Sequence, residues 1–265
     1  MPKIHANEIE LYYELHGPAD AEVLVLSNGV LMSTASWAFQ TPVLSKHYRV
    51  LLYDCRGQWQ SDHPREPYSM ELHADDLAAL LDALAIEKAH IAGISYGAEI
   101  SMIFAYKYPA RTKSLILAST VSQVDPILRG TIQAWIEAAK RKDPELFFRV
   151  TYPTNFREEW IAANSQLLDQ ARTRYASLDF DAVVNLCEAF LKLNITSELH
   201  RIVAPTLLMV GEEDMLKPRR YADIIARAIP RVEYVIVPRS GHALCWEQAG
   251  IFNSVVLGFL RQHPS

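Results

Sequence analysis

The chain has 265 residues, of which 50% are hydrophobic and 22% are charged, and its formal net charge is -5 at pH 7. This length and composition predict one globular unit with a sizeable core and room for one insertion. A negative net charge argues against a surface that binds polyanions, so we expect no nucleic-acid partner.

The N-terminus and the cysteines bear on where the protein works. The first eight residues lack a basic region followed by an apolar run, and no uncharged stretch approaches the about 20 residues that a membrane span needs. Cys55, Cys187 and Cys245 lie far apart and form no Cys-x-x-Cys pair, which is typical of buried thiols in a reducing compartment. We therefore expect a cytoplasmic protein with no membrane partner, and we leave a homodimer open.

The predicted elements begin with two alternating segments, residues 3–9 and 10–15, which meet near the polar Asn7-Glu8 as in an antiparallel hairpin. Continuous apolar runs follow, and their length and β-branched content suit parallel strands that are covered on both faces. Helical patterns alternate with these runs, for example residues 70–84 behind the candidate N-cap Ser69. This alternation predicts an α/β fold with a mostly parallel central sheet. The runs are residues 23–26, 50–53, 89–92, 114–118, 206–210 and 234–237.

One stretch, residues 121–196, breaks the alternation because it contains no convincing strand. Its apolar residues recur at helical spacing, for example Leu128, Ile132 and Trp135. We interpret this stretch as a helical cap that is inserted into a core formed by residues 1–120 and 197–265.

The run Gly-Ile-Ser-Tyr-Gly at residues 93–97 is a G-x-S-x-G motif between a predicted strand and a predicted helix, residues 98–108. Such a motif also occurs by chance in Gly/Ser turns. At a sharp strand-to-helix turn, however, the flanking glycines avoid a backbone collision and the serine hydroxyl stands clear of the sheet. The motif predicts Ser95 as a nucleophile and the Tyr96 N–H as an oxyanion donor.

A serine hydroxyl is a weak nucleophile near neutral pH and needs a histidine base with an orienting carboxylate. His242 and Asp214 each lie on a loop after a predicted strand, so we expect both loops to leave the same sheet edge as Ser95. Glu212 and Glu213 are rivals of Asp214, although they are more typical of exposed turn carboxylates. The predicted triad is Ser95, His242 and Asp214.

A second oxyanion donor is expected on the loop after the first predicted parallel strand. We assign it to the Val30 N–H, and the neighbouring Leu31 could take its place. Leu31, Trp135 and Trp246 are candidate substrate-binding residues, although core packing explains large apolar side chains equally well. The cap also carries Arg149 and Arg157, which leave open a substrate with a carboxylate.

In their chain order, the candidate nucleophile, acid and histidine resemble the α/β-hydrolase superfamily, and the likeness covers nearly the whole chain. The resemblance implies the fold of that family, a Ser-His-Asp triad, and no metal or organic cofactor. Further matching motifs are Asn28-Gly29 in the place of the family's His-Gly, the Asp-x-Arg-Gly turn at residues 54–57, Gly211-x-x-Asp214, and Gly241-His242 with Glu247.

Two departures from the family pattern predict unusual packing near the site. Residues 58–60, Gln-Trp-Gln, replace small residues and glycine, and Ala98-Glu99 stands where a second glycine is common. Glu99 could be a buried acid with a shifted pKa, but we favour a carboxylate on the helix surface or a partner for Arg56.

Residues 24–28 and Ser36-Trp37 are particularly similar to 3-oxoadipate enol-lactonases, which implies hydrolysis of a small ester or lactone through an acyl-enzyme. Asn28-Gly29 resembles, less closely, the synthase that joins two 3-hydroxyacyl chains. An acyltransferase of that type or a carbon–carbon bond hydrolase would use the same triad, and a non-catalytic hydrolase-fold receptor is a further alternative. Dehalogenase and epoxide hydrolase chemistry need a carboxylate at the position of Ser95.

Overall fold

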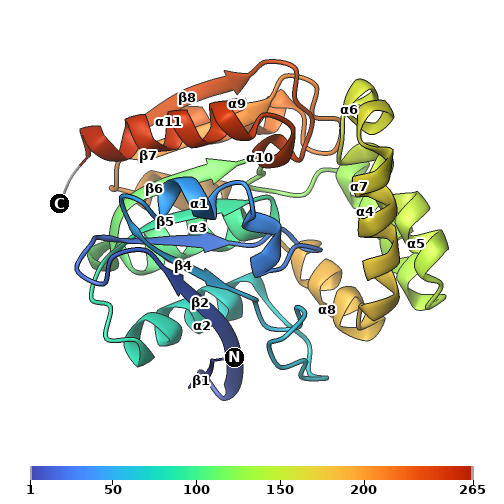
Figure 1. Ribbon diagram of the computed structural model, residues 1–265, viewed down its shortest axis with the longest axis horizontal. Coiled ribbons are helices and arrows are strands. Elements are labelled where there is room, and N and C mark those ends of the chain that lie inside the picture. The colour runs from blue at the N-terminus through green and yellow to red at the C-terminus, as the bar shows by residue number, and fades with distance from the viewer. Residues whose placement is uncertain (1, 264–265) are drawn as a thin grey trace.

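The computed structural model describes residues 2–263, which are built around one eight-stranded sheet with helices on both faces (Figure 1). The strand order is β1-β2-β4-β3-β5-β6-β7-β8. The pairs β1–β2 and β2–β4 are antiparallel and the other pairs are parallel, which confirms the predicted sheet with its N-terminal hairpin. The strands are β1 (Lys3–Ala6), β2 (Ile9–His16), β3 (Val23–Ser27), β4 (Arg49–Tyr53), β5 (Ala89–Ile94), β6 (Thr112–Ala118), β7 (Thr206–Gly211) and β8 (Val232–Val237).

The hairpin turns at the predicted position. Asn7 and Glu8 connect β1 to β2 with φ values of 48° and 69°. Two successive residues with positive φ are typical of the two-residue turns whose twist matches that of the strands they join.

The two faces of the sheet carry separate hydrophobic clusters. Val25 belongs to one cluster, whereas its neighbours Leu24 and Leu26 belong to the other, so β3 is buried on both sides. This explains why the strand appears in the sequence as a continuous apolar run. Helices α2 (Met70–Ala83), α3 (Tyr96–Lys107) and α9 (Arg219–Ala228) contribute to the first cluster, and α1 (Thr41–Leu44), α10 (Leu244–Glu247) and α11 (Ala249–Gln262) to the second.

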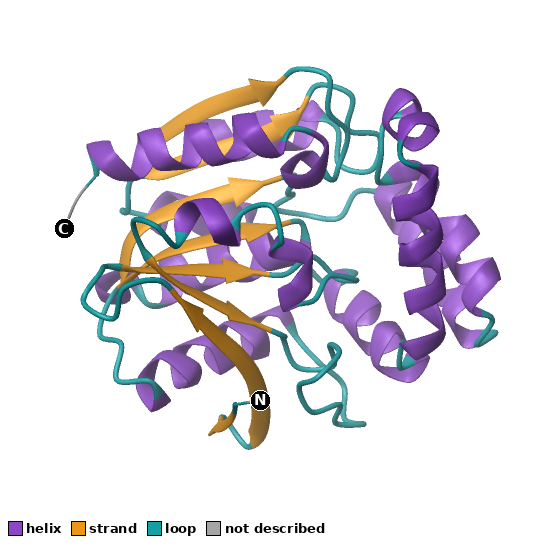
Figure 2. Ribbon diagram, in the orientation of Figure 1, coloured by secondary structure: helices purple, strands orange, loops and turns teal. Residues whose placement is uncertain are grey.

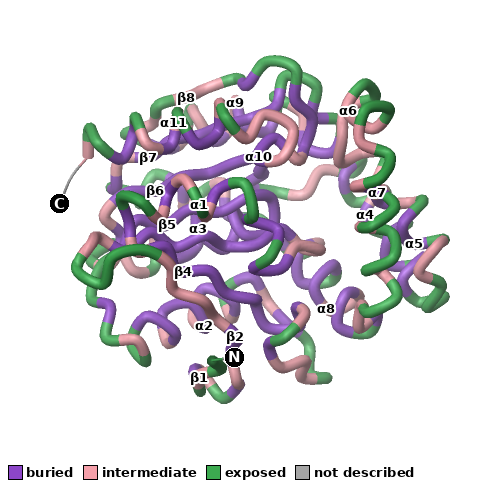
Figure 3. Tube along the Cα trace, in the orientation of Figure 1, coloured by how far each residue is buried: buried purple, intermediate pink, exposed green. Residues whose placement is uncertain are grey.

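The chain between β6 and β7 consists of helices and loops, and its β pairing is limited to an isolated bridge between Gln123 and Asn194. Its helices lie beyond the ends to which the parallel strands point (Figure 2), and the side that they turn toward the sheet is the more buried one (Figure 3). We propose that residues 121–196 form a cap over residues 1–120 and 197–265. The helices are α4 (Pro126–Lys140), α5 (Pro144–Thr151), α6 (Glu158–Ala163), α7 (Ser165–Arg174) and α8 (Phe180–Phe190).

Helix boundaries in the cap follow local sequence signals. Asp125, Asp143 and Asp179 are the N-caps of α4, α5 and α8, and each side chain accepts a hydrogen bond from the first helical turn. Proline occupies the next position in α4 and α5, where its fixed φ suits the start of a helix. None of the helices in residues 2–263 has the length and apolar character that crossing a bilayer requires.

Candidate active site

Ser95 lies at the turn between β5 and α3 with φ 54° and ψ −120°, a backbone conformation that residues other than glycine rarely adopt. The turn brings the backbone close to its surroundings on both sides. A Cβ on Gly93 would collide with the Gly97 carbonyl, and a Cβ on Gly97 would collide with the Ser27 carbonyl in β3. Both glycines of the motif are therefore required by the packing of the turn against the sheet.

His242 and Asp214 are in direct contact. His242 Nδ1 lies 2.9 Å from Asp214 Oδ2, and both residues are buried. Burial favours protonation of the carboxyl group, but the His242 charge, its hydrogen bond and the Lys217 N–H outweigh burial and hold the pKa of Asp214 below its ordinary value. Because the ionised carboxylate accepts the Nδ1–H, Nε2 is left as the basic nitrogen.

Hydrogen bonds fix the loop that carries His242. Ser119 Oγ donates to the His242 carbonyl at 2.8 Å, which ties the loop to the end of β6. The Gly241 N–H donates to Glu247 Oε1 at 2.9 Å, and the Arg157 N–H from the cap donates to Glu247 Oε2 at 3.2 Å. Glu247 therefore joins the histidine loop to the cap.

Ser95 and His242 line one cavity, which holds about 950 Å³ of empty space, part of it open solvent. In the described part of the chain, the hydrogen-bond partner of Ser95 Oγ is Lys217 Nζ at 3.2 Å, and no hydrogen bond joins the hydroxyl to His242. The structure thus brings the predicted serine and histidine to a shared space, and Asp214 behind them.

Lys217 and Glu99 form a buried ion pair beside Ser95 that the sequence analysis missed. Lys217 Nζ lies 2.8 Å from Glu99 Oε1, which also accepts hydrogen bonds from Thr120 Oγ1 at 2.6 Å and from the Val121 N–H at 3.1 Å. Burial raises the pKa of Glu99, and the Lys217 charge and these hydrogen bonds partly offset that effect.

The interpretation of Glu99 as a surface carboxylate or as a partner of Arg56 is wrong. Glu99 is fully buried, because the first turn of α3 lies beneath the loops that follow β6 and β7. Arg56 instead makes a two-pronged contact with Asp76, with Nε–Oδ2 at 2.8 Å and a terminal nitrogen 2.7 Å from Oδ1. The sequence offered one signal for the buried ion pair, because Lys217 follows the candidate acid Asp214 by three positions.

The two candidate oxyanion donors, Val30 and Tyr96, border a smaller side cavity together with Ser95. Gln58 Nε2 donates to the Gly29 carbonyl at 2.9 Å and to the Val30 carbonyl at 3.1 Å. These bonds fix the peptide groups of the loop after β3. Gln58, one of the departures from the family pattern, thus has a structural explanation.

Asn28 connects this loop to its surroundings. Its Oδ1 accepts a hydrogen bond from Trp37 Nε1 at 2.8 Å, and its Nδ2 lies 3.2 Å from Asp54 Oδ1. Burial raises the pKa of Asp54 to about 6, against the effect of hydrogen bonds from the Thr34 and Gln60 N–H groups. The side chain of Asn28 therefore supports the loop after β3.

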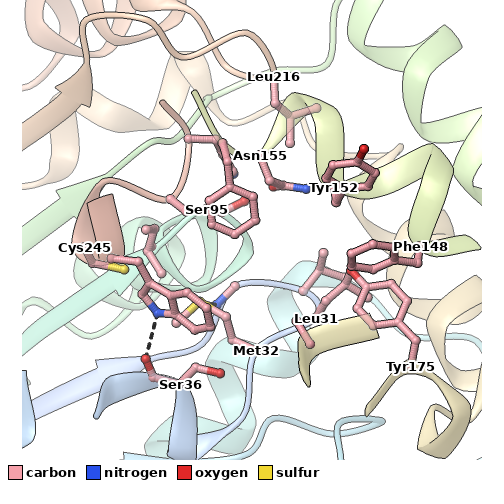
Figure 4. A pocket seen from close by; sticks show the side chains of 18 of the residues that line it. Leu31, Met32, Ser36, Ser95, Phe148, Tyr152, Asn155, Tyr175, Leu216 and Cys245 are labelled. Atoms are coloured by element: carbon pink, nitrogen blue, oxygen red, sulfur yellow. Dashed lines mark hydrogen bonds between the residues drawn. The ribbon is translucent and has the colours of Figure 1, made fainter. Parts of the chain in front are cut away.

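The main cavity is mostly apolar, and all three candidate substrate-binding residues, Leu31, Trp135 and Trp246, line it. Trp246 Nε1 donates to the Ser36 carbonyl at 2.8 Å, which fixes the indole on the core side (Figure 4). The cap contributes further aromatic side chains to the wall: Phe148, Tyr152, Phe156 and Tyr175.

The arginine that borders the cavity is Arg174. It donates to Ser33 Oγ at 2.9 Å and stacks over Trp59 at 4.6 Å. The two arginines that left open a carboxylate substrate do not line the cavity: Arg149 pairs with Glu145 and Arg157 with cap and loop carboxylates. Within residues 2–263, no group of three or more His, Cys, Asp or Glu side chains is arranged to hold a metal ion.

Comparisons with known proteins agree with this architecture. Residues 22–249 match the alpha/beta hydrolase fold family. The "Putative carbamate hydrolase RutD" of Azorhizobium caulinodans is 30% identical over 261 residues, which cover 98% of this chain and 98% of that protein.

Two solved structures superpose along nearly their full length. MGS-M2, an alpha/beta hydrolase enzyme from a Medee basin deep-sea metagenome library, has a TM-score of 0.91 and 31% identity and covers 100% of this chain and 98% of its own. The enol-lactonase from Burkholderia xenovorans LB400 has a TM-score of 0.91 and 26% identity, and the match covers 98% of this chain and 100% of the lactonase.

Proposed function

The chain belongs to the α/β-hydrolase fold family, as its motifs predicted, and we propose that it hydrolyses a carboxylic ester or lactone with Ser95 as the nucleophile. One observation carries this proposal: Ser95 and His242 face a common cavity, while His242 Nδ1 is held by Asp214. That arrangement is the one in which a histidine can deprotonate a serine hydroxyl.

The proposed reaction proceeds by acyl transfer. Ser95 Oγ rotates from Lys217 toward His242 Nε2, which takes its proton as the oxygen attacks the substrate carbonyl. The Val30 and Tyr96 N–H groups donate to the oxyanion, and His242 then protonates the departing alcohol oxygen. Water, deprotonated by the same histidine, releases the acid and restores Ser95.

The mostly apolar wall of the cavity supports an acyl or alcohol group of small to medium size. Likeness to an enol-lactonase over nearly the whole chain supports a lactone among the substrates. A carbamate is the second candidate, because the relatives that share 30% or 31% of their residues with this chain bear the name of carbamate hydrolases. In both cases the nucleophile attacks a carbonyl carbon.

We also propose that the protein works in the cytoplasm. Cys55, Cys187 and Cys245 are all buried and unpaired. Burial raises the pKa of Cys187 and Cys245 to about 12 and also raises the pKa of Cys55, which keeps the thiols protonated and unreactive. Structural free thiols of this kind are typical of a reducing compartment.

The deciding experiment compares wild type, Ser95→Ala and the control Ser101→Ala. Ser101 lies on the same helix, where its hydroxyl bonds to the Gly97 carbonyl and takes no part in the proposed chemistry. We expect a fluorophosphonate probe to label wild type and Ser101→Ala, and both to hydrolyse short p-nitrophenyl esters, whereas Ser95→Ala does neither. Full ester hydrolysis by Ser95→Ala would refute the proposal.

Product analysis separates the alternatives that share the triad. In the presence of a competing alcohol, a hydrolase releases the free acid, whereas an acyltransferase forms the new ester. Release of an amine from an alkyl carbamate, measured beside the ester panel, decides between the two candidate substrate classes.

A further inference from the structure

A small side cavity adjoins the main cavity at the nucleophile, and its about 300 Å³ of empty space includes open solvent. Val30, Ser95, Trp135 and Leu216 line both spaces. The side cavity therefore begins where the acyl carbon of a substrate would be bound to Ser95, on the side of the two candidate oxyanion donors. The other residues that line it are Tyr96, Ile132, Cys187, Phe190 and Lys217.

Two side chains that carry hydrogen-bond donors, Lys217 and Trp135, are among the residues that line this mostly apolar space. Lys217 is 3% exposed, and its ammonium group lies 4.6 Å from the centre of the Phe190 ring. Trp135 is 2% exposed, and its Nε1–H is buried without a hydrogen-bond partner among the described residues. A buried N–H without a partner costs free energy, so an acceptor that reaches the Trp135 Nε1–H would be bound favourably.

Acceptors within residues 2–263 engage two of the three N–H bonds of the Lys217 ammonium. One N–H donates to Glu99 Oε1 and another to Ser95 Oγ. Acylation turns Ser95 Oγ into an ester oxygen, which accepts hydrogen bonds less well than a hydroxyl. The N–H that pointed to Oγ then becomes available to an acceptor on the acyl group.

Geometry and charge limit what that acceptor can be. Lys217 Nζ lies 3.2 Å from Ser95 Oγ, and an oxygen on the carbon next to the acyl carbon is only three bonds from Oγ. Glu99 balances the Lys217 charge, so a hydroxyl or keto oxygen suits the space better than a second carboxylate.

We propose that the side cavity is a subsite for an oxygen on the substrate's acyl group, with Lys217 Nζ and Trp135 Nε1 as its donors. The preferred substrates are then esters of 2-hydroxy or 2-oxo acids. This inference rests on the proposed function and names the substrate class of the same site.

The test compares ethyl butanoate with ethyl 2-hydroxybutanoate and ethyl 2-oxobutanoate. For each enzyme we take the ratio of kcat/KM for the oxygenated ester to kcat/KM for ethyl butanoate, which cancels differences in overall activity. Trp135→Phe keeps an aromatic ring but removes the N–H, and we expect it to lower the ratio about tenfold relative to wild type. Lys217→Met should lower it further.

Two controls keep the outcome clear. Trp160→Phe alters a cap indole that lines neither cavity, so its ratio should match that of wild type. Because Lys217→Met leaves Glu99 buried without its cation, the paired variant Lys217→Met/Glu99→Gln is assayed as well.

The outcomes for the subsite and for the proposed function differ. Unchanged ratios in both Trp135→Phe and the paired variant, with ethyl butanoate still hydrolysed, would overturn the subsite alone. If wild type hydrolyses none of the three esters and the fluorophosphonate probe leaves Ser95 unlabelled, the proposed function itself fails.

Discussion

Lys217 and Glu99 form an ion pair, with Nζ 2.8 Å from Oε1, in a position where side-chain exposure is 4% for the lysine and 0% for the glutamate. The pair joins the loop that carries Asp214 to the helix that follows Ser95. Two of the elements that position the candidate triad are therefore linked through a contact that takes no part in proton transfer.

Breaking this pair should destabilise the fold. We expect Lys217→Met and Glu99→Gln each to lower the free energy of unfolding by about 3–5 kcal/mol, because each leaves a buried group without its partner. The paired variant should recover most of that loss, since neither charge remains. Urea unfolding of the four proteins measures both effects, and strictly additive losses would show that the two side chains do not interact.

Asp214→Asn should abolish most of the activity while the fold persists. The amide keeps the shape of the carboxylate, but it no longer stabilises the His242 imidazolium and favours the wrong tautomer, so we expect kcat to fall by about 10⁴. Glu213→Gln is the matched control, because Glu213 lies next in the chain and is exposed. Steady-state kinetics on one activated ester measure the loss. A comparable loss of kcat in Glu213→Gln would show that the assignment of Asp214 as the acid is wrong.

The elements predicted correctly are those whose signals are local. Strand β3 is buried on both faces, and five successive apolar or small residues in the sequence predict that burial. Strand β8 begins at Val232, two residues before the predicted run, because it is an edge strand whose first residues include the half-buried Val232 and the exposed Glu233. Its pairing with β7, from Thr206 opposite Val232, sets that boundary.

The ion pair beside the nucleophile could not be predicted in the same way. Lys217 is 122 positions from Ser95 and 118 from Glu99, and no periodicity connects residues at such separations. Whether the first turn of α3 is buried depends on which loops pack over it. The candidate triad could be proposed from the sequence because the family motifs mark its members individually, whereas Lys217 belongs to no such motif.

The Ser95 turn should tolerate no side chain at Gly97. A Cβ there would meet the backbone carbonyls of Ser27 and Asn28, which cannot move without disturbing β3. We expect Gly97→Ala to lower the free energy of unfolding by about 2–4 kcal/mol. Gly130→Ala is the opposite case, because a Cβ in α4 would meet open space and should add about 0.5–1 kcal/mol of stability. Equal effects of the two substitutions in urea unfolding would contradict this account.

Glu247 should matter for catalysis although it lies outside the proposed proton path. Its carboxylate accepts the Gly241 and Arg157 N–H groups, and thereby sets the position of the histidine loop against the cap. Glu247→Ala should lower kcat about tenfold to a hundredfold, since small displacements of a base are costly. Gln248→Ala removes an exposed contact next in the chain and serves as the control. Unchanged kcat in Glu247→Ala would show that other contacts suffice to hold the loop.

His73 should make the fold sensitive to acid. Both ring nitrogens are buried without hydrogen-bond partners among the described residues, between the rings of Tyr68 and Tyr96. Burial, with a smaller contribution from the Arg56 charge, lowers the pKa of His73 to about 3. In the unfolded chain the imidazole returns to its ordinary pKa near 6.5.

Between pH 6.5 and about 3 the unfolded state therefore binds a proton that the folded state does not, and stability falls as the pH falls. The loss for one such group approaches about 1.4 kcal/mol per pH unit below the unfolded pKa. His73→Leu fills a similar volume and cannot be protonated. We expect the free energy of unfolding of this variant, minus that of wild type, to increase as the pH falls from 7.5 to 4.5. Carboxylates such as Asp54 titrate equally in both proteins, so their effects cancel in this difference. A difference that stays constant with pH would show that the pKa of His73 is the same in the folded and unfolded states.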